Sequence, residues 1–189
     1  MTISEAFATF PALHTKRLHL RRVGLSDTDA LFDLYGTDDV AQYLDIDTLV
    51  DRAGAAALAE FFVRSYDEQF ALRWGITLRG DNRLIGTCVF NGLDADNRRA
   101  EIGYDLLPAY WRQGIATEAL QAVLLYAFEE MELNRVEAVT SPDNVASRAL
   151  LKKLGFVQEG YLRQRYFHRG SFHDDVFYGL LCSEYLQTR

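Results

Sequence analysis

The most constraining feature of this 189-residue chain is a strand-like segment that runs through a short loop into a helix-like segment. Ala100 to Leu106 has the apolar character of a strand, and Gly114 to Met131 repeats its apolar residues at helical spacing. The loop within Leu107 to Glu118 therefore ends at a helix N-terminus. Unpaired N–H groups and the positive end of the helix dipole make such a place suitable for a phosphorylated anion. The alternative interpretation is an ordinary tight connection.

Two common phosphate-binding motifs are excluded by the residues of this loop. A P-loop needs Gly-Lys-Ser/Thr before its helix, whereas this chain has Gly114-Ile115-Ala116. A dinucleotide-binding loop needs a third glycine and an earlier place in the strand order. The small residues at 114 and 116 still let the main chain approach an anion, and Arg112 can add a charge-assisted contact.

Charge and apolar content restrict the class of protein. The formal net charge of −7 argues against nucleic-acid binding, which needs a basic face, and is compatible with cationic substrates such as amines. With 49% hydrophobic and 25% charged residues, the chain is typical of a globular protein, and we expect one domain over residues 1–189. No apolar run approaches the roughly 20 residues of a membrane helix. We expect a cytoplasmic protein that binds neither nucleic acid nor membrane.

The cysteines and histidines indicate no metal centre. Cys88 and Cys182 lie far apart in apolar runs, and we expect both to be buried, reduced thiols. The four histidines are scattered, so no group of Cys and His has the spacing of metal ligands.

Hydrophobic periodicity predicts a mixed α/β sheet flanked by helices. The order of elements is strand, helix, helix, three strands, helix, strand, helix and two strands. The central strand–helix–strand unit favours one parallel pair. The strands are expected at 17–23, 71–78, 84–91, 100–106, 136–140, 156–167 and 175–181, and the helices at 26–34, 51–66, 114–131 and 143–154.

Several segments, taken in order, resemble a known superfamily. Ala100-Glu101-Ile102-Gly103-Tyr104, the loop, Asn144-Val145-Ala146-Ser147 and Leu154-Gly155-Phe156 are similar to the GCN5-related N-acetyltransferases (GNAT). The C-terminal segments Glu159 to Arg163, Arg169-Gly170 and Asp175 to Tyr178 resemble the RimJ/RimL type, which includes ribosomal-protein N-terminal acetyltransferases. Trp111 is also common in that type. The resemblance covers about residues 15–181.

The resemblance implies a fold and a cosubstrate. The GNAT fold is a mostly antiparallel sheet in which strands 100–106 and 136–140 run parallel and splay apart. Acetyl-CoA would place its diphosphate on the N–H groups of Arg112, Gln113, Gly114, Ile115, Ala116 and Thr117. Its pantetheine arm would pair with free backbone groups of Leu106 and with Asn144. Asn144 is also well placed to cap the helix that follows it.

The resemblance further assigns residues to the chemistry of an amine attacking a thioester. Glu101 occupies a position that often serves as general base, and its alternative is a salt bridge with Arg98 or Arg99. Many members carry a tyrosine as general acid where this chain has Leu151. Ser147 is the nearest hydroxyl by pattern. No cysteine lies where an acetyl-enzyme would need one, so direct transfer is expected.

The acceptor is expected between an early segment and the C-terminal hairpin. Tyr43 with Asp45 and Asp47 would form one wall, and Tyr161, Arg163 and Asp175 the other. His168 and His173 flank the hairpin turn, and Asp175 could equally bond Arg163 across the strands.

The expected function is therefore acetyl transfer from acetyl-CoA to a primary amine. The first choice of acceptor is the α-amine of a protein N-terminus. The alternatives are a small amine, such as an amino acid, polyamine or antibiotic, and a non-catalytic acyl-CoA-binding module. A homodimer is compatible with the resemblance.

Overall fold

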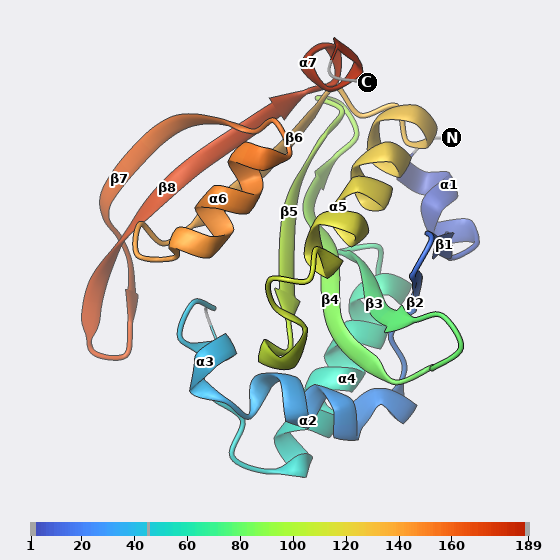
Figure 1. The fold of residues 1–189 in the computed structure, drawn as a ribbon, viewed down its shortest axis with the longest axis vertical. Helices are drawn as coiled ribbons and strands as arrows, with labels where there is room; N and C mark the ends of the chain where they lie inside the picture. The colour runs from blue at the N-terminus through green and yellow to red at the C-terminus, as the bar shows by residue number, and fades with distance from the viewer. Residues whose placement is uncertain (1–2, 45, 188–189) are drawn as a thin grey trace.

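The computed structural model describes residues 3–44 and 46–187, which form one eight-stranded sheet with helices on both faces (Figure 1). The strands lie in the order β1-β2-β3-β4-β5-β6-β8-β7. Their bounds are Leu13–His14 (β1), Leu18–Arg22 (β2), Leu72–Leu78 (β3), Leu84–Asp94 (β4), Arg99–Leu106 (β5), Arg135–Thr140 (β6), Val157–His168 (β7) and Ser171–Leu181 (β8). The α-helices are Ile3–Ala8 (α1), Thr28–Tyr35 (α2), Asp38–Ala41 (α3), Arg52–Asp67 (α4), Ile115–Leu125 (α5), Val145–Lys153 (α6) and Cys182–Gln187 (α7).

The central strands β5 and β6 form a fork. They are the parallel pair of an otherwise antiparallel sheet, and their register joins Arg99 to Arg135, Ala100 to Val136 and Glu101 to Glu137. Beyond Glu101 the described residues of the two strands do not pair with each other, although β5 continues to Leu106 and β6 to Thr140. The predicted fold class and the predicted splayed pair are confirmed.

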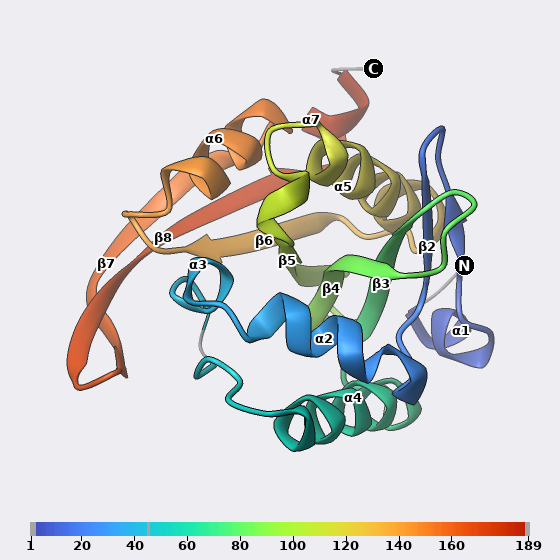
Figure 2. The ribbon, with the colours of Figure 1, turned by 60° about the horizontal axis from the view of Figure 1, so that its bottom comes forward.

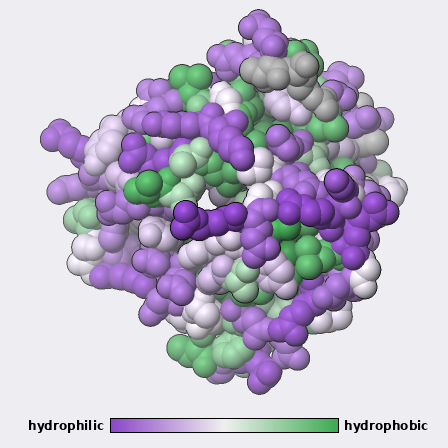
Figure 3. Space-filling model, in the orientation of Figure 1, coloured by the Kyte–Doolittle hydropathy of each residue, from purple (hydrophilic) through white to green (hydrophobic). Residues whose placement is uncertain are grey.

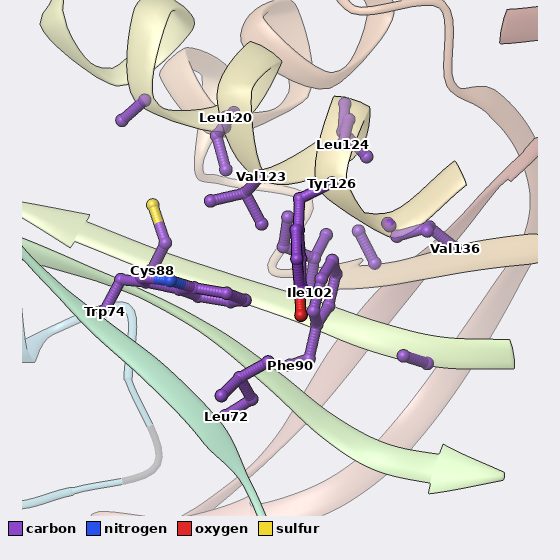
Figure 4. Close-up of a cluster of buried hydrophobic side chains, with 14 of the residues drawn as sticks. Leu72, Trp74, Cys88, Phe90, Ile102, Leu120, Val123, Leu124, Tyr126 and Val136 are labelled. Atoms are coloured by element: carbon purple, nitrogen blue, oxygen red, sulfur yellow. The ribbon is translucent and has the colours of Figure 1, made fainter. Parts of the chain in front are cut away.

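The two faces of the sheet carry different helices. Helix α5 packs Leu120, Val123 and Leu124 against Ile102 and Phe90 (Figure 4). Helices α2 and α4 cover part of the opposite face (Figure 2), where Leu31, Leu34, Phe62 and Leu84 form a second cluster. Side chains alternate along a strand, so Ile102, Tyr104 and Leu106 face α5, whereas Glu101, Gly103 and Asp105 face the side of α2.

All the predicted strands and helices are present, with corrections at their ends. The predicted helix 114–131 begins at Ile115, because Gly114 is its left-handed N-cap residue, and its last turns form a π-helix over Tyr126–Glu130. The elements missed by periodicity are α1, β1, α3 and α7, each of at most six residues. Such lengths are too short to show a period.

Two further expectations can be compared with the structure. Cys88 is buried as expected, but Cys182 is only partly buried, because it begins α7 at the end of the sheet. No helix within residues 3–44 and 46–187 combines the length and the hydropathy needed to cross a bilayer.

Candidate active site

The loop before α5 presents a row of unused main-chain donors. The first helical bond of α5 runs from Glu118 N–H to Gly114 O, and within the described chain no group accepts from the N–H groups of residues 112–117. Arg112 and Gly114 both have positive φ, +59° and +74°, so the backbone is left-handed at two positions of the loop. Successive N–H groups in such turns form an anion-binding nest, and the N-terminus of α5 adds its dipole.

Neighbouring groups hold this loop in place. The indole N–H of Trp111 donates to Leu106 O at 2.6 Å, and Gln113 Nε2 donates to Ala109 O at 2.7 Å. The resemblance implies free backbone groups of Leu106 for a pantetheine arm, and the structure shows that its carbonyl already accepts from Trp111. Binding of the pantetheine arm by Leu106 therefore stays a prediction. It would use the Leu106 N–H or the second lone pair of the Leu106 carbonyl oxygen.

A hollow of about 610 Å³ lies beside the loop on the α5 face. It runs from Thr15 and Glu118 along α5 to the end of α6, where Lys152 and Lys153 line it. Near the middle of the same face, Figure 3 shows a hollow where Figure 1 places the gap between β5 and α6. The 610 Å³ hollow therefore gives an anionic ligand room beside the start of α5, with Lys152 and Lys153 at its far end.

The start of α6 brings three polar groups to the fork. Asn144 caps the helix, because its Oδ1 accepts from Ser147 N–H at 3.0 Å. Within the described residues, Nδ2 of Asn144 donates to no group, so the capping role leaves its donor available. The Ser147 hydroxyl lies 2.8 Å from the Tyr104 hydroxyl, which reaches it from β5.

Tyr104 is a site residue that the sequence reasoning missed. Leu151, which replaces the usual tyrosine, is 1% exposed and packs in the core. A phenol from the neighbouring strand reaches the fork instead. Burial raises the pKa of Tyr104 above its usual value, so its hydroxyl is protonated at neutral pH. Its alternation with Ile102 and Leu106 was the signal that placed it on this face.

Glu101 lies at the vertex of the fork, on the face opposite to Tyr104. It is the last residue of β5 that pairs with β6, and its side chain is half-buried. Arg99, one partner considered from the sequence, forms ion pairs with Asp94 at 3.2 Å and Glu137 at 3.0 Å. The position of Glu101 is compatible with a role as general base, and that role stays a prediction.

On the face of Glu101, a carboxylate further along β5 joins the strand to α2. Asp105 Oδ2 accepts from the Tyr35 hydroxyl at 2.6 Å, and Oδ1 accepts from Thr87 N–H at 2.9 Å. Burial raises the pKa of Asp105, against the opposing effects of Arg73 and these hydrogen bonds. Tyr35 is the last residue of α2, so its hydrogen bond to Asp105 ties the end of α2 to the strand that carries Glu101. The early acceptor wall continues from this end of α2.

The two predicted acceptor walls meet at the hairpin turn. Arg169, between β7 and β8, donates to Thr48 Oγ1 at 3.0 Å and lies 3.9 Å from Asp38 and 4.0 Å from Asp47. Tyr43 is 41% exposed on the early wall. Asp45, also predicted for that wall, lies outside the described residues.

A wide bulge in β7 shapes the other wall. Leu162 pairs with Asp175 and Tyr166 with His173, so three residues of β7 stand opposite Asp174 alone. Asp174 accepts from the Tyr161 hydroxyl and, at 2.7 Å, from the N–H of Gln164, whose φ is +52°. Bulges of this kind redirect side chains.

This bulge gathers some of the predicted residues and separates others. A hollow of about 850 Å³ is lined by Tyr161, Arg163 and Asp174 among its six residues, whereas Asp175 lies outside it. Asp174, which the sequence did not single out, accepts from the Tyr161 hydroxyl and so orients this predicted residue. At the hairpin end, His173 contacts Ser171 Oγ at 2.9 Å, and the buried Nε2 of His168 has no hydrogen-bond partner in the described chain.

Comparisons with known proteins agree on the class of domain. A family model described as an acetyltransferase (GNAT) domain matches residues 17–157. The uncharacterized N-acetyltransferase YoaA of Bacillus subtilis is 38% identical over 172 residues, which cover 91% of this chain and 97% of that protein.

Two further similarities concern ribosomal-protein acetyltransferases. The ribosomal-protein-serine acetyltransferase of Escherichia coli strain K12 is 35% identical over 98 residues, 52% of this chain and 55% of that protein. A solved structure of RimL, a ribosomal L7/L12 α-N-protein acetyltransferase in complex with coenzyme A, has a TM-score of 0.81. It is 24% identical and covers 90% of this chain and 98% of its own, a likeness that concerns the fold.

Proposed function

Because this chain belongs to the acetyltransferase (GNAT) family and is an acetyl-CoA-dependent N-acyltransferase, we propose that it acetylates the α-amine of a protein N-terminus. The observation that carries the proposal is the fork, with Glu101 on one face of the sheet and the Tyr104–Ser147 pair on the other. The names of two relatives support the choice of acceptor: a putative ribosomal N-acetyltransferase of Bacillus subtilis and the ribosomal-protein-serine acetyltransferase of Escherichia coli.

The donor lies on the α5 face in this proposal. The N–H groups of residues 112–117 bind the diphosphate, because they have no partner in the described chain and lie at the N-terminus of α5. Nδ2 of Asn144 binds a carbonyl of the pantetheine arm while Oδ1 caps α6. The acyl thioester of acetyl-CoA supplies the electrophilic carbon at the fork.

Glu101 removes the proton from the acceptor's ammonium group through a water molecule. The neutral amine then forms the N–C bond, the C–S bond breaks, and the second proton of the nitrogen passes through the same water molecule to the solvent. A main-chain N–H near Tyr104 to Leu106 stabilises the oxyanion. Glu101 lies on the face where α2 packs, and the early wall with Tyr43 follows α2 in the chain, so the base and the amine approach from the same side. Tyr161 pairs with Val176 and lies on the opposite face of the sheet.

The Tyr104–Ser147 pair protonates the leaving thiolate. Ser147 gives its proton to sulfur and recovers one from Tyr104, since their hydroxyl oxygens lie 2.8 Å apart. The raised pKa of Tyr104 makes it a weak acid, but a free thiol has a pKa near 8.5, so the thiolate can leave before it is protonated and a strongly acidic group is not required. This pair takes the place of the tyrosine that Leu151 replaces.

A small amine is the second candidate, and Arg169 is the observation that favours it. Its contact with Thr48 joins the two acceptor walls and narrows the groove at the hairpin end. A polyamine or amino acid needs less room than the end of a polypeptide.

A thiol-release assay with acetyl-CoA distinguishes these acceptors. The panel contains N-terminal peptides that begin with Ser or Ala, the same peptides with a blocked N-terminus, and a set of amino acids, polyamines and aminoglycosides. We expect turnover with the free peptides and none with the blocked ones. Turnover with a small amine alone would overturn the proposal and leave the second candidate.

A further inference from the structure

A residue from the start of the chain braces the loop before α5. Arg17, just before β2, donates from Nη1 to Gln113 O at 2.9 Å and from Nε to Glu118 Oε2 at 2.6 Å. Its main-chain N–H donates to Glu118 Oε1 at 2.8 Å, and the Thr15 hydroxyl donates to the same oxygen at 2.6 Å. These contacts cross about a hundred positions of sequence and converge on one turn of backbone.

Glu118 is the anchor of this brace. Burial alone would raise its pKa, but the hydrogen bonds from Thr15 and Arg17 lower the pKa below its usual value. The carboxylate is therefore ionised at neutral pH and holds the guanidinium from the first turn of α5. The brace fixes the loop at Gln113 and the helix at Glu118, on either side of the unpaired N–H groups.

The positive charge of Arg17 lies beside the N-terminus of α5, where it can attract a bound anion. A Cβ built on Gly114 would lie 3.5 Å from Arg17 Nη2, so this nitrogen lies against the nest, and the side chain is 43% exposed. A cation beside a helix N-terminus is unfavourable by itself, because the dipole there is positive. A bound anion reverses that balance, since it is attracted by both the dipole and the guanidinium.

We propose that Arg17, held by Glu118, positions the loop for the diphosphate of the acyl donor and supplies a cation to it. The inference rests on the proposed binding of acetyl-CoA at this loop. It extends the site to residues that lie outside the loop and outside the sequence-based assignment.

Calorimetric titration with CoA and with dephospho-CoA tests the proposal without an acceptor. Both ligands contain the diphosphate, whereas only CoA carries the 3′-phosphate. We expect Arg17→Ala to weaken both by the same factor, about tenfold to 100-fold, as for a charge-assisted hydrogen bond. The dependence of log Kd on log salt should also become shallower. A purely structural role would leave that slope unchanged.

Two more variants complete the test. Glu118→Gln should weaken both ligands about threefold to tenfold, because one charge of the brace is lost. Arg83→Ala, which removes the exposed ion pair with Asp33, is the matched control and should change Kd less than twofold.

Several results would overturn the proposal. Unchanged affinity in Arg17→Ala or in Glu118→Gln would contradict the brace. A loss confined to CoA would place Arg17 at the 3′-phosphate and not at the diphosphate. A wild-type protein that binds neither ligand would contradict the donor site itself.

Discussion

The donor side and the acceptor side of the fork are built from different materials. On the donor side, main-chain N–H groups of residues 112–117 form the surface. Trp111 and Arg17 hold the loop by hydrogen bonds, and the guanidinium of Arg17 lies beside Gly114. On the acceptor side, exposed side chains form the surface, including Tyr43 at 41% exposure. A site made of backbone suits one constant ligand, whereas a surface of side chains can be changed to suit another acceptor.

The largest expected effect comes from the carboxylate at the boundary between the two sides. Glu101→Gln should lower kcat/KM by about 10²–10⁴-fold, because the general base is lost, and should leave CoA affinity unchanged. Steady-state kinetics and calorimetry measure the two quantities. Glu137→Gln is the matched control, since Glu137 pairs with Glu101 in the register but its carboxylate binds Arg99 and Arg135. A loss below tenfold in Glu101→Gln would assign Glu101 to structure.

The next effect should appear on the donor side alone. Gly114→Val places a β-branched residue at φ +74°, which displaces the nest and should weaken CoA binding about 100-fold through loss of two charge-assisted hydrogen bonds. Gly80→Val imposes the same strain at φ +86° in a turn where a Cβ meets nothing within 4 Å. Calorimetry should find its CoA affinity unchanged. Equal losses in both variants would mean that strain, and not the nest, controls binding.

A smaller effect should follow removal of the Tyr104 hydroxyl. Tyr104→Phe should lower kcat about tenfold, with CoA affinity unchanged, because a thiolate is a good leaving group and needs little acid assistance. Ser147→Ala should behave similarly. The double variant should be no worse than either single one, since the two hydroxyls act as a unit. Multiplicative losses in single-turnover kinetics would mean that they act independently.

The smallest expected effect is the loss of the Asp174 hydrogen bonds in the β7 bulge at acidic pH. The hydrogen bonds from Tyr161 and from Gln164 N–H lower the pKa of Asp174. Since its folded pKa lies below the unfolded value of about 3.9, these bonds contribute stability above about pH 4, and that contribution is lost as the pH falls through the folded pKa. The amide shift of Gln164, followed by NMR from pH 6 to 2, should report this loss. Asp174→Asn should abolish the titration, and an amide shift that titrates unchanged in that variant would refute the assignment.

The predictable parts of the molecule are those encoded over short stretches of chain. The strand, loop and helix around Gly114 follow from local spacing, and Asn144 is a capping residue just before its helix. The splayed pair was expected from the family resemblance, and the structure confirms it.

The unpredicted parts depend on contacts between distant segments. Tyr104 meets Ser147 from a position 43 residues away, and Arg17 meets Glu118 from 101 residues away. The bulge in β7 shifts the register and brings Asp174, which was not predicted for the site, to the hydroxyl of Tyr161. A pattern of residue types along one strand carries no information about such a shift, because the shift is decided by the pairing with β8.

The fork has a consequence for how the enzyme is reset after each turnover. In the proposed mechanism, Glu101 ends with one proton too many and the Tyr104–Ser147 pair with one too few. Glu101 and the Tyr104–Ser147 pair lie on opposite faces of the sheet, with the backbone of β5 between them. Neither can neutralise the other directly, so each must exchange its proton with bulk water on its own side. The catalytic cycle therefore closes through the solvent.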